Sequence, residues 1–159
     1  MDPLAKLVAI EEIKRLKARY FRCVDTKDWV GLATVFTPDA IFDLRAVNSV
    51  PNPLTGAVEP PISQSDADVY RGRYAVLAMI HAAVETLVTV HHGHTPEIEI
   101  TSETTAAGVW AMEDVIRNAP DAPPLSIDGY GHYHETYERL DGVWAIKTTR
   151  ITRLYVRRG

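Results

Sequence analysis

The chain has 159 residues, of which 46% are hydrophobic and 24% charged, values that are ordinary for one globular domain with a core large enough to fold unaided. The net charge of −4 argues against nucleic acid or an anionic membrane as a partner, and the single cysteine, Cys23, excludes an internal disulfide. No apolar run reaches the roughly 18 residues of a membrane span, and the N-terminal segment, which is amphipathic and contains several acidic residues, is unlike a signal peptide. We therefore expect a single domain, residues 1–159, in the reducing cytoplasm.

The first segment has the periodicity of a helix. Apolar side chains recur there at steps of three and four residues, which predicts one long amphipathic helix over about residues 4–24: Leu7, Ile10, Ile13, Leu16, Tyr20 and Val24. A short helix is expected around residues 28–36, with Asp28 as its N-cap. The motif "TPDA" (residues 37–40) indicates a turn, and "AIFDL" (residues 40–44) a short strand.

The stretch from Arg45 to Asp68 differs in composition from the rest of the chain. It contains four prolines together with several serine, asparagine and glycine residues: Pro51, Pro53, Pro60 and Pro61. Such sequence sustains neither a helix nor a strand ladder, so we expect a long surface loop or lid. A third helix is predicted over about residues 71–87.

The second half of the chain has the sequence pattern of β-strands. Residues 88–100, 104–116, 126–140 and 143–156 each alternate or are rich in β-branched and aromatic residues. Turns are expected near residues 101–104 and at Gly142, and a second loop at residues 119–124. A sheet of such strands must bury one face, and only the helices can cover it. The sequence therefore predicts an α+β fold, a cone with a pocket between the first helix and the curved sheet.

Three histidines, His91, His92 and His94, lie where the chain enters the first long strand. Strand alternation places His91 on the face of Gly93 and the other two on the opposite face, unless Gly93 bulges. Because imidazole titrates near neutrality, His91 is a candidate proton acceptor. A polar residue that only makes hydrogen bonds at a strand end explains the pattern as well.

Tyr20 and Asp25 lie at the end of the first helix. Tyr20 continues the apolar face, so it should point inward, whereas Asp25 is about 140° further round an ideal helix. Asp25 can be a simple helix-end residue, or it can meet His91. In the second case its carboxylate would fix the imidazole tautomer and raise its basicity.

A metal site is disfavoured, because the residues that could bind one lack a consistent facing. His91 and His94 point to opposite faces of a strand, and no spacing links His132 and His134 to a third ligand. Dinucleotide, ATP and serine-hydrolase motifs are absent as well. We therefore expect no metal.

Four stretches together resemble the SnoaL-like branch of the NTF2-like superfamily: "IEEIKRLKARYFRCVDTKDW", "HHGHTPEIEITSETTAAGVWAMED", "YERLDGVWAI" and "TRLYV". The likeness is greatest to bacterial bile-acid dehydratases, with scytalone dehydratase and a dehydrochlorinase as more distant relatives. It covers nearly the whole chain except the proline-rich stretch. It implies a cone-shaped α+β barrel with a deep apolar pocket and no cofactor.

The same resemblance implies roles for individual residues. The positions of the family's catalytic residues fall here on Tyr20, Asp25 and His91, and that of a substrate-binding arginine falls on Arg153. His94 matches a structural position. The implied activity is a cofactor-independent dehydratase acting on a hydrophobic ring compound with a carbonyl, steroid-like or polyketide-like. An isomerase or cyclase with the same enolate chemistry, or a non-catalytic binding module, remains open. A homo-oligomer is implied, a trimer before a dimer.

Overall fold

The computed structural model describes residues 1–159 as three helices packed on a curved sheet. The helices are α1 (Pro3–Asp25), α2 (Trp29–Ala33) and α3 (Arg73–Val84). The strands are β1 (Phe36–Asp43), β2 (Val50–Pro51), β3 (Val58–Glu59), β4 (Val69–Arg71), β5 (Leu87–Ile100), β6 (Thr105–Asn118), β7 (Ser126–Leu140) and β8 (Val143–Arg158). A 3₁₀ turn spans Asp66–Asp68.

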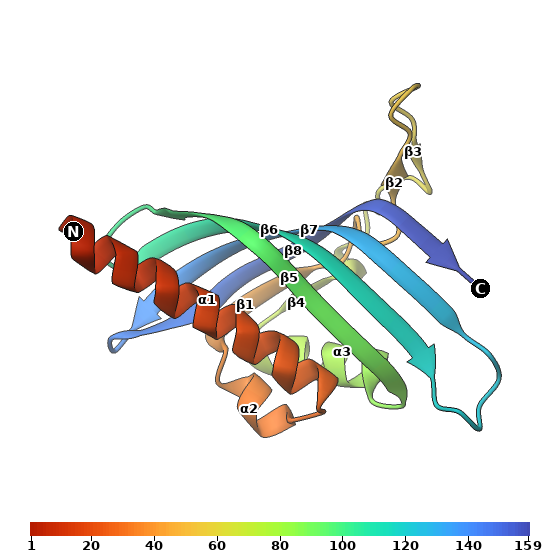
Figure 1. Ribbon diagram of the computed structural model, residues 1–159, viewed down its shortest axis with the longest axis horizontal. Coiled ribbons are helices and arrows are strands. Elements are labelled where there is room, and N and C mark those ends of the chain that lie inside the picture. The colour runs from red at the N-terminus through yellow and green to blue at the C-terminus, as the bar shows by residue number, and fades with distance from the viewer.

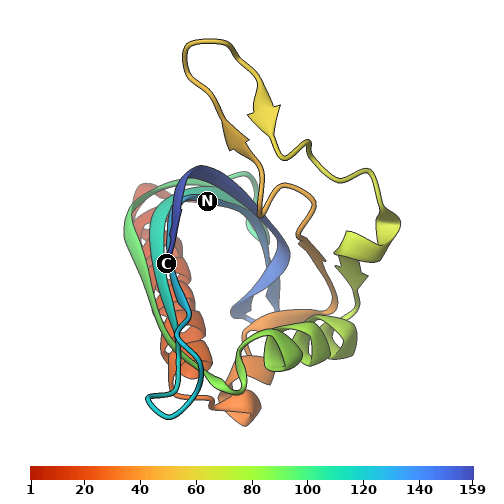
Figure 2. The same ribbon diagram turned by 90° about the vertical axis from the view of Figure 1, so that its right-hand side faces the viewer.

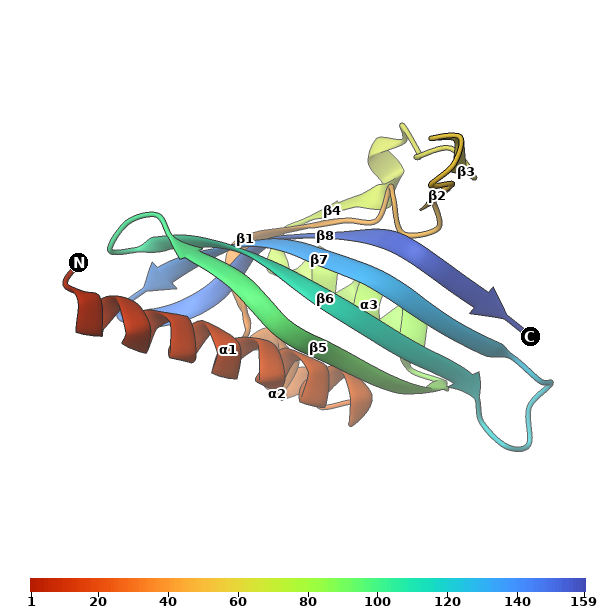
Figure 3. The same ribbon diagram turned by 45° about the horizontal axis from the view of Figure 1, so that its top comes forward.

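Six strands form one sheet in the order β4-β1-β8-β7-β6-β5. The four long strands β5 to β8 make an antiparallel meander, while β1 pairs with β8 in parallel. Helix α1 runs beside β5, and α2 lies near the C-terminal end of α1 (Figure 3). Seen along the long axis, the sheet curls around the space that α1 and α3 close off (Figure 2). The α+β architecture expected from the sequence is therefore confirmed.

Helix α1 packs along the long strands of the sheet (Figure 1). Asp2 caps its start by accepting a hydrogen bond from the Ala5 N–H (3.0 Å), and Ile13, Leu16 and Val24 are buried as the periodicity predicts. Leu7, in contrast, is 64% exposed, because the first turns extend beyond the core. Helix α2 begins as expected, with Asp28 accepting from the Gly31 N–H at 2.8 Å.

Two local expectations fail in the region between α2 and α3. Residues 37–40 are not a turn but lie inside β1, whose register with β8 shifts between Phe36 and Ile41. An irregular strand with a proline at position 38 shows no regular alternation, which explains the error. The proline-rich stretch also contains a short hairpin, β2–β3, held by only two residue pairs. That hairpin projects away from the body of the molecule (Figure 2).

The later elements agree with the sequence pattern apart from their ends. Helix α3 is shorter at both ends than residues 71–87, because β4 occupies residues 69–71 and β5 begins at Leu87. The four long strands and their turns are confirmed. Asp141 and Gly142 both adopt positive φ (50° and 84°), the conformation that a two-residue hairpin between twisted strands requires. No helix is both long and apolar enough to cross a membrane.

Candidate active site

Asp25 and His91 meet on the inner face of the sheet. The Nδ1 of His91 lies 2.6 Å from Oδ1 of Asp25, and the His91 main-chain N–H donates to Oδ2 at 2.8 Å. Of the two alternatives that the sequence leaves open for Asp25, the structure therefore shows the contact with His91. Since a carboxylate only accepts, it selects the tautomer with the proton on Nδ1 and leaves Nε2 as the basic nitrogen.

Local sequence explains why these two residues come together. Asp25 is the last residue of α1, and Lys27 follows with φ of 60°, which ends the helix beside the start of β5. On β5, Gly93 shares the inner face with His91. A Cβ atom at Gly93 would lie 2.6 Å from the Phe21 ring, so only glycine allows helix and strand to pack this closely.

Two residues that the sequence argument did not single out support the Asp25 carboxylate. The Thr89 hydroxyl donates to Asp25 Oδ1 at 2.9 Å, and the Lys27 ammonium donates to the Thr89 oxygen at 3.1 Å. Thr89 is two residues before His91 and therefore shares its strand face, a signal that was available in the sequence. Desolvation by burial lowers the pKa of Lys27, although the Asp25 charge opposes this effect.

The charge state of Asp25 follows from these contacts. Its partial burial raises the pKa of the carboxyl, but the hydrogen bonds from the His91 imidazole, the His91 main chain and Thr89 together outweigh burial. The net result is a pKa below the ordinary value of 3.8. Asp25 is therefore an anion at neutral pH, as the partner of a proton-accepting imidazole should be.

Tyr20 lies on the inward face of α1, as the periodicity predicts, and is 4% exposed. Its ring packs edge to face on Tyr133, with centroids 6.2 Å apart. Burial, and secondarily the charge of Glu135, raises the pKa of the Tyr20 phenol well above its usual value of 10. Tyr20 therefore stays protonated and can act only as a neutral hydrogen-bond donor or acceptor.

Arg153 is buried and held by three contacts. Its Nη2 donates to Asp114 Oδ2 at 2.8 Å, its Nε donates to the Val47 carbonyl at 3.1 Å, and its Nη1 faces the Met112 sulfur at 3.5 Å. Asp114 is the register partner of His91 on the neighbouring strand, so both side chains share the inner face. Asp114, which no motif in the sequence indicates, thus lies between His91 and Arg153.

The carboxylate of Asp114 is only half satisfied. Oδ1 is buried and accepts no hydrogen bond, whereas Oδ2 holds Arg153. Arg153 Nη1 likewise has only the thioether sulfur, a weak acceptor, as its neighbour. One acceptor and one donor on this inner face therefore remain available to a polar group of a ligand.

The other histidines of the strands lie on the outer face of the sheet. His92 Nδ1 contacts Glu113 Oε1 at 2.8 Å, and His134 Nε2 contacts the Thr152 hydroxyl at 3.0 Å. The rings of His132 and His134 are neighbours, with centroids 6.2 Å apart, and His94 is exposed. No three His, Cys, Asp or Glu side chains converge in the geometry of a metal site.

Beneath Tyr20 lies a buried ion pair that the sequence did not reveal. Lys17 Nζ and Glu135 Oε1 are 2.6 Å apart with both side chains fully buried, and the ammonium also lies 3.5 Å from the Tyr133 ring centroid. Glu135 accepts further hydrogen bonds from Tyr137 (2.7 Å) and Thr149 (3.2 Å). Burial lowers the pKa of Lys17, although Glu135 opposes this effect.

The pocket expected between α1 and the sheet is not among the main clefts of the molecule. None of the five principal clefts is lined by Asp25 or His91. The His91 side chain is 9% exposed, and large rings, those of Tyr20, Phe21 and Tyr133, pack together beside it. A bulky ligand would reach His91 only if some of these side chains moved.

The helices and the curved, mostly antiparallel sheet form an α+β fold of the NTF2-like class. The family model of the SnoaL-like domain matches residues 5–150, and the chain belongs to this family.

The individual proteins that this chain resembles share about a quarter of its residues or fewer. The protein named "Probable cyclase FGR4" from Gibberella zeae is 25% identical over 144 residues, covering 90% of this chain and 89% of its own. A crystal structure described as "Putative Scytalone Dehydratase" from Novosphingobium aromaticivorans superimposes with a TM-score of 0.73 at 23% identity, covering 96% and 89% of the two chains. The hexachlorocyclohexane dehydrochlorinase LinA-type3 from Novosphingobium barchaimii gives 0.75 at 19%, covering 99% and 94%. These structural likenesses show the shared fold.

Proposed function

We propose that this protein is a cofactor-independent lyase, a dehydratase that acts on a hydrophobic ring compound bearing a carbonyl. The observation that carries the proposal is the 2.6 Å contact between Asp25 and His91 on the inner face of the sheet. Membership of the SnoaL-like family and the names of the similar proteins, which include a dehydratase, a dehydrochlorinase and a cyclase, support it.

The chemistry follows from the roles of the two residues. His91 Nε2 removes the proton from the carbon next to the substrate carbonyl, and the Asp25 anion stabilises the imidazolium that forms. The electron pair of the broken C–H bond forms an enolate and then expels the hydroxyl group. The imidazolium returns its proton to that hydroxyl, which leaves as water.

Other inner-face residues have supporting roles in this proposal. Tyr20, kept protonated by burial, donates to the developing enolate oxygen. Arg153 Nη1 exchanges its weak contact with the Met112 sulfur for the substrate carbonyl or an anionic group. The free Oδ1 of Asp114 accepts from a hydroxyl of the substrate.

Isomerisation or ring closure is the second candidate, and the cyclase among the relatives favours it. The same base and enolate serve all these reactions, so residues alone do not separate them. Product mass separates them, because only dehydration loses water.

We also propose that the protein is a homo-oligomer, a trimer before a dimer.

The test is a screen of hydroxylated steroid and polyketide ketones, followed by mass spectrometry for loss of water. With a substrate in hand, His91→Ala should abolish most of the chemical step, since a positioned base is worth about 10²–10⁴-fold in rate. Asp25→Asn should also lower the rate steeply, because the amide no longer favours the correct tautomer.

His92→Ala is the matched control. His92 is adjacent in sequence but points to the outer face, where it contacts Glu113. It should turn over substrate like the unmodified protein. Near-normal turnover by His91→Ala would show that His91 is not the base. A product with the same mass as the substrate would show that the reaction is isomerisation or cyclisation and not dehydration.

A further inference from the structure

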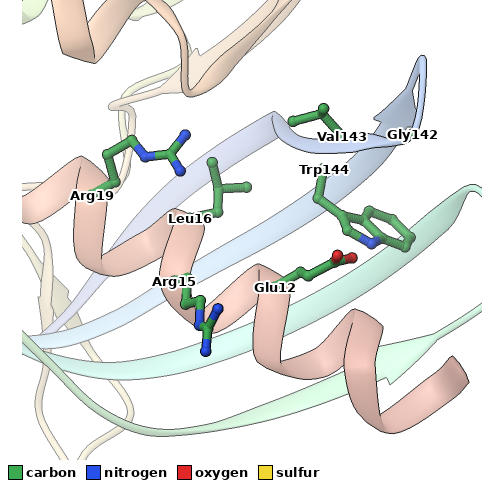
Figure 4. A pocket seen from close by; sticks show the side chains of 7 residues that line it. All are labelled: Glu12, Arg15, Leu16, Arg19, Gly142, Val143 and Trp144. Atoms are coloured by element: carbon green, nitrogen blue, oxygen red, sulfur yellow. The ribbon is translucent and has the colours of Figure 1, made fainter. Parts of the chain in front are cut away.

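A second polar site lies where the first half of α1 meets the β7–β8 hairpin. A cleft of about 190 Å³ opens there (Figure 4), and none of its residues belongs to the Asp25–His91 site. The helix and the hairpin line it together: Glu12, Arg15, Leu16 and Arg19 from α1, and Gly142, Val143 and Trp144 from the hairpin.

The wall of this cleft contains a buried donor without an acceptor. Trp144 is only 3% exposed, and its Nε1 is buried with no hydrogen-bond partner in the chain. Buried indole N–H groups nearly always find an acceptor, because leaving one unpaired forfeits the hydrogen bond that it makes with water. An unpaired indole in a cleft wall therefore points to a ligand that accepts from it.

The same cleft contains an acceptor without a donor. Glu12 Oε2 is buried and accepts no hydrogen bond, and the nearest cationic atom, Arg139 Nη2, is 4.0 Å away, beyond hydrogen-bond length. The Glu12 carboxylate is directed toward the Trp144 ring (Figure 4), yet the two do not hydrogen-bond. A ligand that satisfies both groups must carry an acceptor and a donor.

Charge and size narrow the ligand further. Arg19 has no ion-pair partner, and Arg15 has only an exposed contact with Glu11 at 3.8 Å, which holds it weakly. Two available guanidinium groups favour a negatively charged acceptor such as a carboxylate. A cleft of about 190 Å³ is smaller than the roughly 300–1,000 Å³ pockets that take drug-sized ligands, so the ligand is small. Leu16 and Val143 supply apolar contact.

We propose that this cleft binds a small organic acid whose carboxylate lies next to a hydroxyl or ammonium donor, the chemistry shared by hydroxy acids and amino acids. The carboxylate accepts from Trp144 Nε1, and the donor group bonds to Glu12 Oε2. The positive charge of Arg19, beyond Leu16 in the same cleft (Figure 4), attracts the anion. The site is independent of the Asp25–His91 chemistry, so it stands or fails separately from the proposed lyase activity.

The indole N–H resonance of Trp144 in ¹⁵N-labelled protein is the readout. The chain has three tryptophans, and Trp144→Phe identifies the resonance; if that variant does not fold, cross-relaxation with Leu16 and Val143 identifies it instead. The probes are lactate, L-alanine and propionate, which lacks the donor. Lactate or alanine should shift the resonance saturably, and propionate should bind about tenfold more weakly, because one hydrogen bond to a charged group is missing.

Variants of the cleft distinguish a hydroxy acid, whose donor is a hydroxyl group, from an amino acid, whose donor is an ammonium group. Glu12→Gln removes the negative charge, so it should weaken alanine more than lactate if an ammonium ion is the natural donor. Arg19→Leu should weaken every carboxylate. Arg22→Leu, on the same helix but outside the cleft, is the matched control and should leave binding unchanged.

Three outcomes would overturn the proposal. The Trp144 resonance does not respond to any probe, or it responds equally in the Arg19→Leu protein. In the third outcome it shifts with protein concentration alone, which would show that a second copy of the chain covers the cleft.

Discussion

Asp25 carries its charge because hydrogen bonds outweigh its burial. Three donors, the His91 imidazole, the His91 main chain and the Thr89 hydroxyl, converge on the two carboxylate oxygens. An aspartate at the end of a helix is commonly exposed, so the sequence alone left its role open. Its position became predictable only through the likeness to a family, whereas Thr89 could have been found from strand alternation.

The lowered pKa of Asp25 predicts a pH-dependent contribution to stability. The pKa in the folded protein lies below the ordinary value of 3.8, so the unfolded chain binds a proton first as the pH falls. The contribution is complete at neutral pH and is lost as the pH falls below 3.8 through the folded-state pKa. The free energy of unfolding in urea should therefore fall more steeply with acid in the unmodified protein than in Asp25→Asn.

Asp121→Asn is the control for that measurement, because Asp121 is exposed in the connection between β6 and β7. Its acid profile should follow that of the unmodified protein. If Asp25→Asn shows the same pH dependence as both, the hydrogen bonds do not hold the carboxyl in its charged form.

At the scale of elements, α1 is fastened to β7 by a charge pair as well as by apolar packing. Lys17 lies on the inward side of the helix, and its partner Glu135 is 118 residues away in the chain. No periodicity signals that a lysine is buried, because burial depends on a carboxylate that the fold brings to it. The apolar face of α1 was predictable, and the ion pair inside it was not.

Replacing only Lys17 should lower the free energy of unfolding more than replacing both Lys17 and Glu135. Lys17→Met leaves Glu135 charged in a fully buried site and should lower the free energy of unfolding by about 3–5 kcal/mol. The double variant Lys17→Met/Glu135→Leu replaces both charges by apolar side chains, so it should lose clearly less. Urea denaturation of the three proteins measures the difference. Additive losses would show that each residue is stabilised independently of the other.

The β2–β3 hairpin, unlike α1, contributes little to the core. It is held by two residue pairs, and Leu54 near its tip is 93% exposed. Replacing residues 50–59 by a short turn, with Val47 kept as the acceptor for Arg153, should leave the melting temperature nearly unchanged and alter substrate preference instead. A large loss of thermal stability with unchanged preference would show that the hairpin is packed structure.

For the whole molecule, the regular parts were predictable and the irregular ones were not. The long strands alternate in sequence as they do in burial, from Thr105 to Asp114 for example, so four strands and their turns could be read directly. Strand β4 has only three residues, and β1 joins β8 in parallel through a register shift, so neither has a period long enough to detect. The filling of the inner space by Tyr20, Phe21 and Tyr133 also depends on packing that no local pattern encodes.

The arrangement of histidines over the whole fold gives the last prediction, that the protein binds no stoichiometric transition metal. His91 lies on the inner face with an aspartate, while His92 and His134 contact other partners on the outer face. A metal site needs at least three protein ligands around one point, and the sheet separates these imidazoles. Elemental analysis of protein purified without a histidine tag should find far less than one zinc or iron per chain, and a chelator should leave turnover unchanged. About one metal ion per chain, lost together with activity on chelation, would contradict a mechanism in which His91 acts as a free base.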